Sequence, residues 1–238
     1  MSNQLCASKE PERQWRVASY DPSLTLTERF RTHFTAGSLS ETFQTQGYAV
    51  MDGLFGGEWC ANIRAEIAEL HGRGLLQNSQ NMLAAVKKQA DDADAAGFQG
   101  YVLNKPNIYE RSLVVDGEVT DEPVLHSLKH LKEFYSVHIP ELTQHLNVAF
   151  PDLRLGELDE LKLQYNAGNG GSFPMHFDTA VTTGRELTAI LYLNEDWMPT
   201  HGGELRIYPF PYEHHDIAPR SDRFLLFCSH QMLHRIRF

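Results

Sequence analysis

Apolar positions follow a helical period in the first half of this chain and a strand period in the second half. Between residues 58 and 71 the apolar residues recur at spacings of three and four, which predicts one helix. Its apolar stripe consists of Cys60, Ile63, Ile67 and Leu70. The order Asp121-Glu122-Pro123 is typical of a helix start and predicts a second amphipathic helix over 124–135.

Beyond residue 156 the helical period ends, and short extended segments follow one another at intervals of about ten residues. They are LKLQYN, PMHFD, RELTAILYLNE, GGELRIYP, HHDIAP, RFLLFCS and HRIRF, separated by Gly, Pro, Asn and Asp. Helices followed by a regular series of short strands predict an α+β fold that is mainly β in its C-terminal half. We expect a double-sheet roll or sandwich with the helices packed on one face.

The polar segment 1–40 shows no sustained period, which predicts a flexible N-terminal arm ahead of one domain over 41–238. Within that domain, 84–97 mixes alanine with charged residues and is read as a solvated helix or a mobile loop. We expect no internal repeat and no linker between domains.

Composition excludes several classes of function. The chain is 42% hydrophobic with a net charge of −10 and has no cluster of Lys and Arg, so we expect no nucleic-acid partner. No stretch approaches the ~20 apolar residues of a membrane span. The first residues are too polar for a secretory signal, so we expect no membrane association and a location in the cytoplasm or nucleus.

Two His-x-Asp patterns offer metal-ligand chemistry, about as many as chance would place in a shuffled chain of this composition. On a strand, residues i and i+2 face the same way, so His176 and Asp178 can converge on one ion if a third ligand arrives from elsewhere. His214 and Asp216 have the same spacing but follow two prolines, and there a solvated loop is the better interpretation.

His234 is the candidate third ligand. It follows the apolar run 224–228, and in a roll a histidine from a far strand can complete the site across the interior. His230 is a rival, although its pairing with His234 requires a helix where the pattern is strand-like. Two imidazoles and one carboxylate are typical of non-haem Fe(II) oxygenases. Spacing alone also allows His176 and His234 to be hydrogen-bonded core histidines.

Four ordered blocks make the chain resemble the Fe(II)- and 2-oxoglutarate-dependent dioxygenases, in the prolyl 4-hydroxylase branch that includes the oxygen-sensing prolyl hydroxylases. They are YNAGNG at 165–170 before His176-x-Asp178, LYLNEDW at 191–197, GGELRIYP at 202–209, and DRFLLF at 222–227 before His234. The resemblance covers about residues 46–238. It implies a double-stranded β-helix (jelly-roll) core with N-terminal helices on one sheet.

The resemblance implies that His176, Asp178 and His234 hold Fe(II). It also implies that Tyr165 and Tyr192 line the pocket of the co-substrate 2-oxoglutarate, where a phenol can donate to a carboxylate. Leu205 is a candidate apolar wall of that pocket. Arg206 is interpreted as a structural ion-pair partner.

The implied reaction couples oxidative decarboxylation of 2-oxoglutarate to hydroxylation, with O2 as oxidant and ascorbate as an auxiliary reductant. The implied substrate is a proline in another protein or peptide, with region 76–116 as a lid. The family holds the far carboxylate of 2-oxoglutarate with a basic residue about ten positions after the distal histidine, in a charge-assisted pair. This sequence ends four residues after His234. We therefore expect the domain to lack its last strands and the native chain to extend beyond Phe238.

Two other classes of function stay open at this point. One is a catalytically impaired or non-catalytic jelly-roll module that binds a partner peptide. The other is a zinc or manganese hydrolase on a similar roll, which would turn over without oxygen. Uptake of Fe(II) and dependence on O2 distinguish the three.

Overall fold

The computed structural model describes residues 20–35, 38–84, 100–178 and 184–237. Within them the helices are α1 (Leu26–Thr35), α2 (Ser38–Gln46), α3 (Gly57–Gly72), α4 (Glu122–Ser127), α5 (Lys129–Glu133) and α6 (Ile139–Ala149), with the turns η1 (Phe134–His138), η2 (Pro151–Leu153) and η4 (Pro199–His201). The strands are β1 (Tyr48–Asp52), β2 (Gln77–Ala84), β3 (Gly100–Val115), β4 (Glu118–Val119), β5 (Leu161–Asn166), β6 (Phe173–His176), β7 (Leu187–Tyr192), β8 (Leu205–Tyr208), β9 (His215–Ile217), β10 (Arg223–Cys228) and β11 (Leu233–Ile236).

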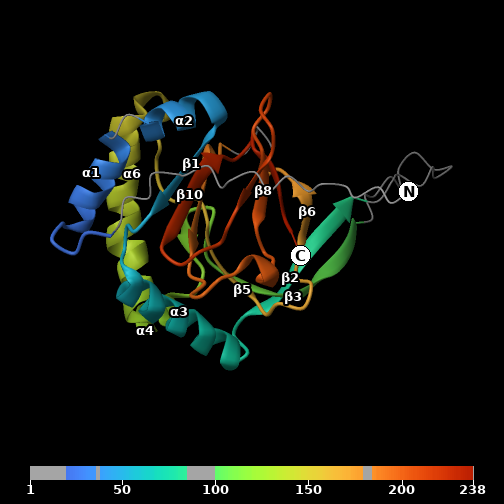
Figure 1. Cartoon of the computed structure of the whole chain (residues 1–238). Helices are drawn as coiled ribbons and strands as arrows, with labels where there is room; N and C mark the ends of the chain where they lie inside the picture. The colour runs from blue at the N-terminus through green and yellow to red at the C-terminus, as the bar shows by residue number, and fades with distance from the viewer. Residues whose placement is uncertain (1–19, 36–37, 85–99, 179–183, 238) are drawn as a thin grey trace, which may run out of the picture.

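Two antiparallel sheets form the roll at the centre of Figure 1. One has the strand order β1-β10-β7, and the other has the order β6-β11-β8-β9. Their inner faces enclose one apolar cluster, which we call the roll core: Tyr48, Val50, Leu205, Ile207, Ile217, Leu225, Phe227 and Met232. Apolar residues alternate in β8 because only one of its faces reaches this core. The jelly-roll architecture is confirmed.

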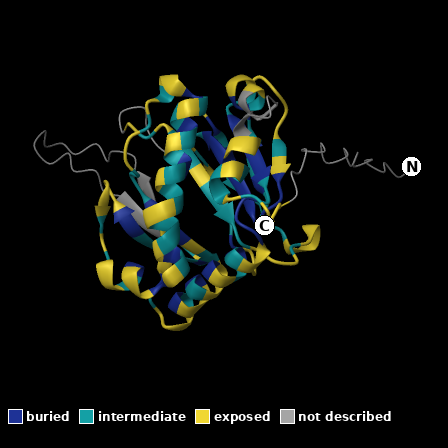
Figure 2. Ribbon diagram, turned by 90° about the vertical axis from the view of Figure 1, so that its left-hand side faces the viewer, coloured by how far each residue is buried: buried dark blue, intermediate teal, exposed yellow. Residues whose placement is uncertain are grey.

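Helices cover the outer face of the β1-β10-β7 sheet. Phe224 and Leu226 of β10 point to that face and pack against Leu142 and Leu146 of α6. Strand β10 is therefore apolar on both faces, which explains its unbroken run of buried residues. In Figure 2 the helices show exposed residues toward the solvent, whereas the strands behind them are mostly buried. Helices on one sheet agree with the sequence-based expectation.

A long hairpin of β2 and β3 extends beside the roll, and β5 pairs with the other edge of β3. Helix α3 packs on this sheet through Ile63, Ile67 and Leu70, the stripe that the sequence predicts. Helix α4 starts where expected, because the carboxylate of Asp121 accepts a hydrogen bond from the backbone N–H of Val124. The segment 85–99, which contains most of the predicted helix or loop, lies outside the described residues. None of the described helices has the length and apolarity that a membrane crossing requires.

The prediction of a flexible arm over 1–40 is wrong for its C-terminal part. Residues 26–35 form α1, and the ring of Phe30 is completely buried against the helical layer. The helix begins with a capping box, in which Thr25 and Glu28 each accept a hydrogen bond from the other's backbone N–H. This Thr-x-x-Glu pattern is a start signal that a search for apolar period overlooks. Residues 1–19 lie outside the described part of the chain.

Candidate metal centre

Three side chains converge at the edge between β6 and β11. His176 is the last residue of β6, His234 lies on β11, and Asp178 follows two residues after His176. Their ligand atoms all lie within 4.8 Å of one another. Within the described ranges, this is the one group of three or more His, Cys, Asp or Glu side chains placed closely enough to share a metal ion.

Each imidazole is oriented by a backbone carbonyl two residues before it. The Nδ1 atom of His176 lies 2.8 Å from the carbonyl oxygen of Pro174, and that of His234 lies 3.0 Å from that of Met232. A carbonyl oxygen only accepts hydrogen bonds, so each Nδ1 must carry the proton. The lone pair of each Nε2 is then left for a cation, which is the usual arrangement of a metal-binding histidine.

Both Nε2 atoms face the same carboxylate oxygen. Oδ1 of Asp178 lies 3.5 Å from Nε2 of His176 and 3.3 Å from Nε2 of His234. Ligand bonds of about 2.1 Å at right angles separate neighbouring ligand atoms by about 3 Å, so these spacings fit one shared ion. Two imidazoles and one carboxylate on one side of the ion match the donor set of non-haem iron oxygenases.

Asp178 is held in its charged form. Burial alone would raise its pKa, but hydrogen bonds from His176 and His234 in their protonated form lower the pKa well below the usual range of an aspartate. A cation bound in place of those Nε2 protons would stabilise the carboxylate in the same way. The same hydrogen bond to Asp178 is the main cause that raises the pKa of His176. The carboxylate is therefore ionised at neutral pH, as a metal ligand must be.

A chain of hydroxyl groups supports Asp178 from β7. The Thr188 hydroxyl helps to lower the pKa of the Asp178 carboxylate, and its oxygen lies 2.9 Å from the hydroxyl oxygen of the completely buried Ser229. Sequence reasoning missed both residues. A signal existed for Thr188, which shares the inward face of β7 with Tyr192 because the two are four residues apart.

Two details of the expected geometry are wrong. Asp178 does not continue the strand, because β6 ends at His176 and the chain bends at Asp178. His234 does not approach across the interior either. It is the direct register partner of His176, since β11 and β6 are hydrogen-bonded neighbours in one sheet. The two histidines meet as a cross-strand pair, with ring centroids 4.4 Å apart.

The second His-x-Asp pattern has a different role. Asp216 lies on β9, a strand rather than a loop, and accepts hydrogen bonds from Nε and Nη2 of Arg206 at 2.6 and 2.8 Å. Arg237 donates to the same carboxylate at 2.8 Å. The prediction that Arg206 is an ion-pair partner is confirmed. His230 is not part of the metal-binding group.

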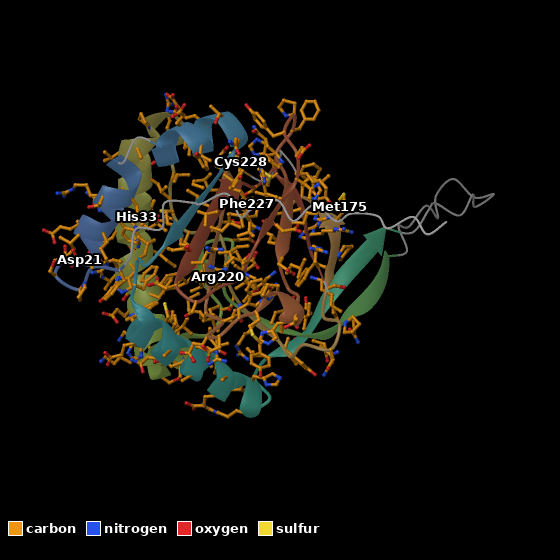
Figure 3. All side chains as sticks on the ribbon, viewed as in Figure 1. Asp21, His33, Met175, Arg220, Phe227 and Cys228 are labelled. Atoms are coloured by element: carbon orange, nitrogen blue, oxygen red, sulfur yellow. The ribbon has the colours of Figure 1, made fainter. Side chains whose placement is uncertain are left out.

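The three residues expected around 2-oxoglutarate fall into two places. Leu205 belongs to the roll core, and Tyr192 packs against it. Phe227 is also part of the roll core, and its ring centroid lies 4.9 Å from that of His234. Burial of its phenol raises the pKa of Tyr192 far above the usual value, so the hydroxyl stays a donor. In Figure 3, Phe227 lies among the side chains at the centre of the roll.

Tyr165 packs elsewhere. Its ring stacks on His71 of α3, with centroids 4.1 Å apart, and it borders the cluster between α3 and the hairpin sheet. The co-substrate contacts of Tyr165, Tyr192 and Leu205 all stay predictions. So do the metal-ligand roles of the triad.

Comparison with known proteins supports the resemblance seen in the sequence. The model of the 2OG-Fe(II) oxygenase superfamily matches residues 162–237, which contain all three triad residues. The hypoxia-inducible factor prolyl hydroxylase of Caenorhabditis elegans is 28% identical over 206 residues, which are 84% of this chain and 25% of that protein. The chain therefore spans about a quarter of the length of this curated relative.

Solved structures show the same architecture. A prolyl 4-hydroxylase structure from Phytophthora capsici has a TM-score of 0.67 at 29% identity and covers 92% of this chain and 63% of that one. A Trichoplax adhaerens prolyl hydroxylase, solved with a peptide fragment of the hypoxia-inducible factor oxygen degradation domain, has a TM-score of 0.65 at 20% identity. It covers 89% of this chain and 85% of that one. These similarities to enzymes do not favour the alternative of a non-catalytic binding module.

Proposed function

We propose that this chain, which resembles the prolyl hydroxylases of the 2OG-Fe(II) oxygenase superfamily, is an Fe(II)- and 2-oxoglutarate-dependent dioxygenase that hydroxylates a proline in another polypeptide. The observation that carries the proposal is the convergence of the Nε2 atoms of His176 and His234 on one carboxylate oxygen of Asp178, at 3.5 and 3.3 Å, with each Nδ1 held by a backbone carbonyl. Two imidazole nitrogens and a carboxylate oxygen in this arrangement can all coordinate one cation.

The protein's own groups have separable tasks. The carbonyls of Pro174 and Met232 fix the orientation of the two imidazoles, and Thr188 fixes the carboxylate of Asp178. When bound by these residues, Fe(II) supplies the oxidising chemistry that couples decarboxylation of 2-oxoglutarate to hydroxylation of a substrate C–H bond. The apolar roll core behind His234 excludes water, which strengthens each charged contact in the site.

Tyr192 is the group we assign to 2-oxoglutarate. Its phenol stays protonated and can donate a hydrogen bond to a carboxylate. It is the register partner of Arg223, whose guanidinium group makes a two-point pair with Asp52 at 2.7 Å. Because Asp52 already pairs with that guanidinium group, the phenol of Tyr192 is the group that we expect to contact 2-oxoglutarate.

Succinate formation tests the function. The protein, Fe(II), 2-oxoglutarate and a panel of synthetic proline-containing peptides are mixed with and without O2. We expect succinate and hydroxyproline to form together, only with O2, and His176→Ala to abolish both while His230→Ala keeps them. Absence of succinate above the His176→Ala level contradicts the proposal. Turnover that persists without O2 would instead favour a metal-dependent hydrolase.

We also propose ascorbate as an auxiliary reductant and the cytoplasm or nucleus as the location. Both rest on the sequence-based expectation. If the first is correct, ascorbate raises the number of turnovers before inactivation without altering the initial rate. Imaging of the tagged chain in cells tests the second, and a secreted or organelle-bound signal contradicts it.

A further inference from the structure

A cavity of about 500 Å³ lies between the β3 side of the hairpin and the β6–β11 edge of the roll. We call it the β3–β6 cleft. Exposed residues on both walls, Asn104 and Pro106 on β3 and Pro174 and Met175 on β6, place its mouth at the surface. Met175 marks the β6 wall in Figure 3, beside the hairpin.

The cleft is cationic in a chain whose net charge is −10. Lys105, Arg235 and Arg237 line it, and none of its lining residues is acidic. Arg237 is paired with Asp216 outside the cleft. Nε of Arg235 is buried and has no hydrogen-bond partner. A buried donor without an acceptor is costly and indicates where an acceptor would bind.

Lys105 is held over an aromatic ring rather than by a carboxylate. Its Nζ lies 3.7 Å from the centroid of Phe173, and the charge of Glu110 acts on it without a salt bridge between the two in the described part of the chain. Burial lowers the pKa of Lys105, so its charge lacks full solvation. An anion placed in the cleft would relieve that cost.

The cleft adjoins the metal centre. The ring of Phe173 is stacked 6.2 Å from that of His176, and the charge of Lys105 interacts with that of Asp178. A polypeptide in the cleft would therefore lie beside the strand that ends in His176. Pairing of such a chain as an added strand is disfavoured, because Pro106 and Pro174 remove backbone donors from the two walls.

We propose that the β3–β6 cleft binds a carboxylate-bearing segment of the polypeptide substrate, with Lys105 and Arg235 as its anion-binding groups. This rests on the proposed function, for which it names a substrate class: a proline-containing segment with aspartate or glutamate close to the reactive residue. The apolar contacts come from Pro106, Pro174 and Phe173. The two cations, Lys105 and Arg235, favour a segment that carries negative charge.

Binding of two labelled peptides tests the proposal by fluorescence anisotropy. Both hold a central proline in the same sequence, flanked by aspartates in one and by asparagines in the other. We expect the aspartate peptide to bind more tightly, with an advantage that shrinks as salt is raised. Because the net charge of the protein repels acidic peptides, a preference for aspartate points to a local cationic site.

Variants locate the site. Lys105→Met keeps the length of the side chain over Phe173 and removes its charge. It should weaken binding of the aspartate peptide about fivefold, which is the upper end of the range for a partly exposed ion pair. Adding Arg235→Met should remove the preference, while Arg235→Lys should retain part of it if the methionine variant folds poorly. Lys132→Met is the matched control, since it removes one charge from an exposed position on α5.

Three outcomes overturn the inference. The first is equal binding of both peptides, and the second is a preference that survives loss of both cations or falls equally in Lys132→Met. The third is an anaerobic titration in which Lys105→Met weakens the binding of 2-oxoglutarate but not the binding of the peptide. Lys105 would then bind the co-substrate and not the substrate. Peptide binding needs no turnover. If no succinate forms but the aspartate peptide still binds more tightly, the result contradicts the proposed function and leaves the anion-binding site supported.

Discussion

His176-x-Asp178 and His214-x-Asp216 are the same three-residue pattern, and both belong to the β6-β11-β8-β9 sheet or its ends. At the first, the carboxylate lies within 3.5 Å of two imidazoles at the edge of the roll core. At the second, it lies on the outer face between two guanidinium groups. Imidazoles offer lone pairs to a cation, whereas guanidinium groups offer only N–H donors. The partners, and not the pattern, decide between a metal site and an ion pair.

Substitution of each aspartate should separate the two sites most strongly. Loss of an outer partner of a metal site already weakens binding about 10–100-fold, so Asp178→Asn, which changes a ligand, should weaken Mn(II) or Fe(II) binding by more than about a hundredfold. Asp216→Asn should leave metal affinity unchanged. Anaerobic calorimetry with Mn(II) measures both. Equal losses in the two variants would mean that the triad is not the metal site.

Removal of the Thr188 hydroxyl should have a smaller effect on the same site. Thr188→Val keeps the shape of the side chain and removes the hydroxyl that helps to lower the pKa of Asp178, so metal affinity should fall about tenfold. Thr188→Ser retains the hydroxyl and should stay near the native affinity. The circular dichroism spectrum should be the same in both. Equal affinity of the valine and serine variants would show that Thr188 does not position the carboxylate.

Substitution of Asp216 should change the stability of the fold. Asp216→Asn leaves Arg206 and Arg237 without their shared carboxylate on a partly exposed face, which should lower the free energy of unfolding by about 1 kcal/mol. Glu69→Gln breaks the exposed pair with Arg73 and should cost about 0.3 kcal/mol. Urea denaturation compares the three proteins. A cost for Asp216→Asn no larger than for Glu69→Gln would remove the ion-pair role.

The smallest expected effect is the pH dependence of the difference in unfolding free energy between the native protein and Asp216→Asn. Burial alone would raise the pKa of Asp216, but hydrogen bonds from Arg206 lower it below the usual value. A lowered pKa stabilises the fold above the unfolded-state pKa of about 3.9 and loses that contribution as the pH falls through the folded-state value. The gap in unfolding free energy between the native protein and Asp216→Asn should therefore close below about pH 4. A gap that widens on acidification contradicts this sign.

Much of the fold follows from patterns that extend over neighbouring residues. The stripe on α3 and the alternation in β5 and β8 are local consequences of burying one face, so the sequence predicts them well. Helix α1 was missed because a buried ring such as Phe30 gives no sustained period by itself. Its capping box was the more informative local signal.

The donor types of the candidate site are evident in the sequence, but its neighbours are not. His176, Asp178 and His234 stand out because few residue types bind iron and they occur in the family's order. Lys105 gave no signal at all, because its closeness to Phe173 results from two strands that lie far apart in the chain. Tyr165 could not be placed either, since a half-buried strand position suits packing on His71 as well as a cofactor contact.

The sequence by itself determined the class of fold, the main helices and strands, and the three residues with metal-binding chemistry, because each depends on residue type and local period. Only the tertiary structure decided that His234 meets His176 as a strand neighbour, that Asp216 faces two arginines, and that a cationic cleft borders the triad. Those facts depend on strand order and on which face of a sheet a side chain takes. Both are set by the packing of segments far apart along the chain.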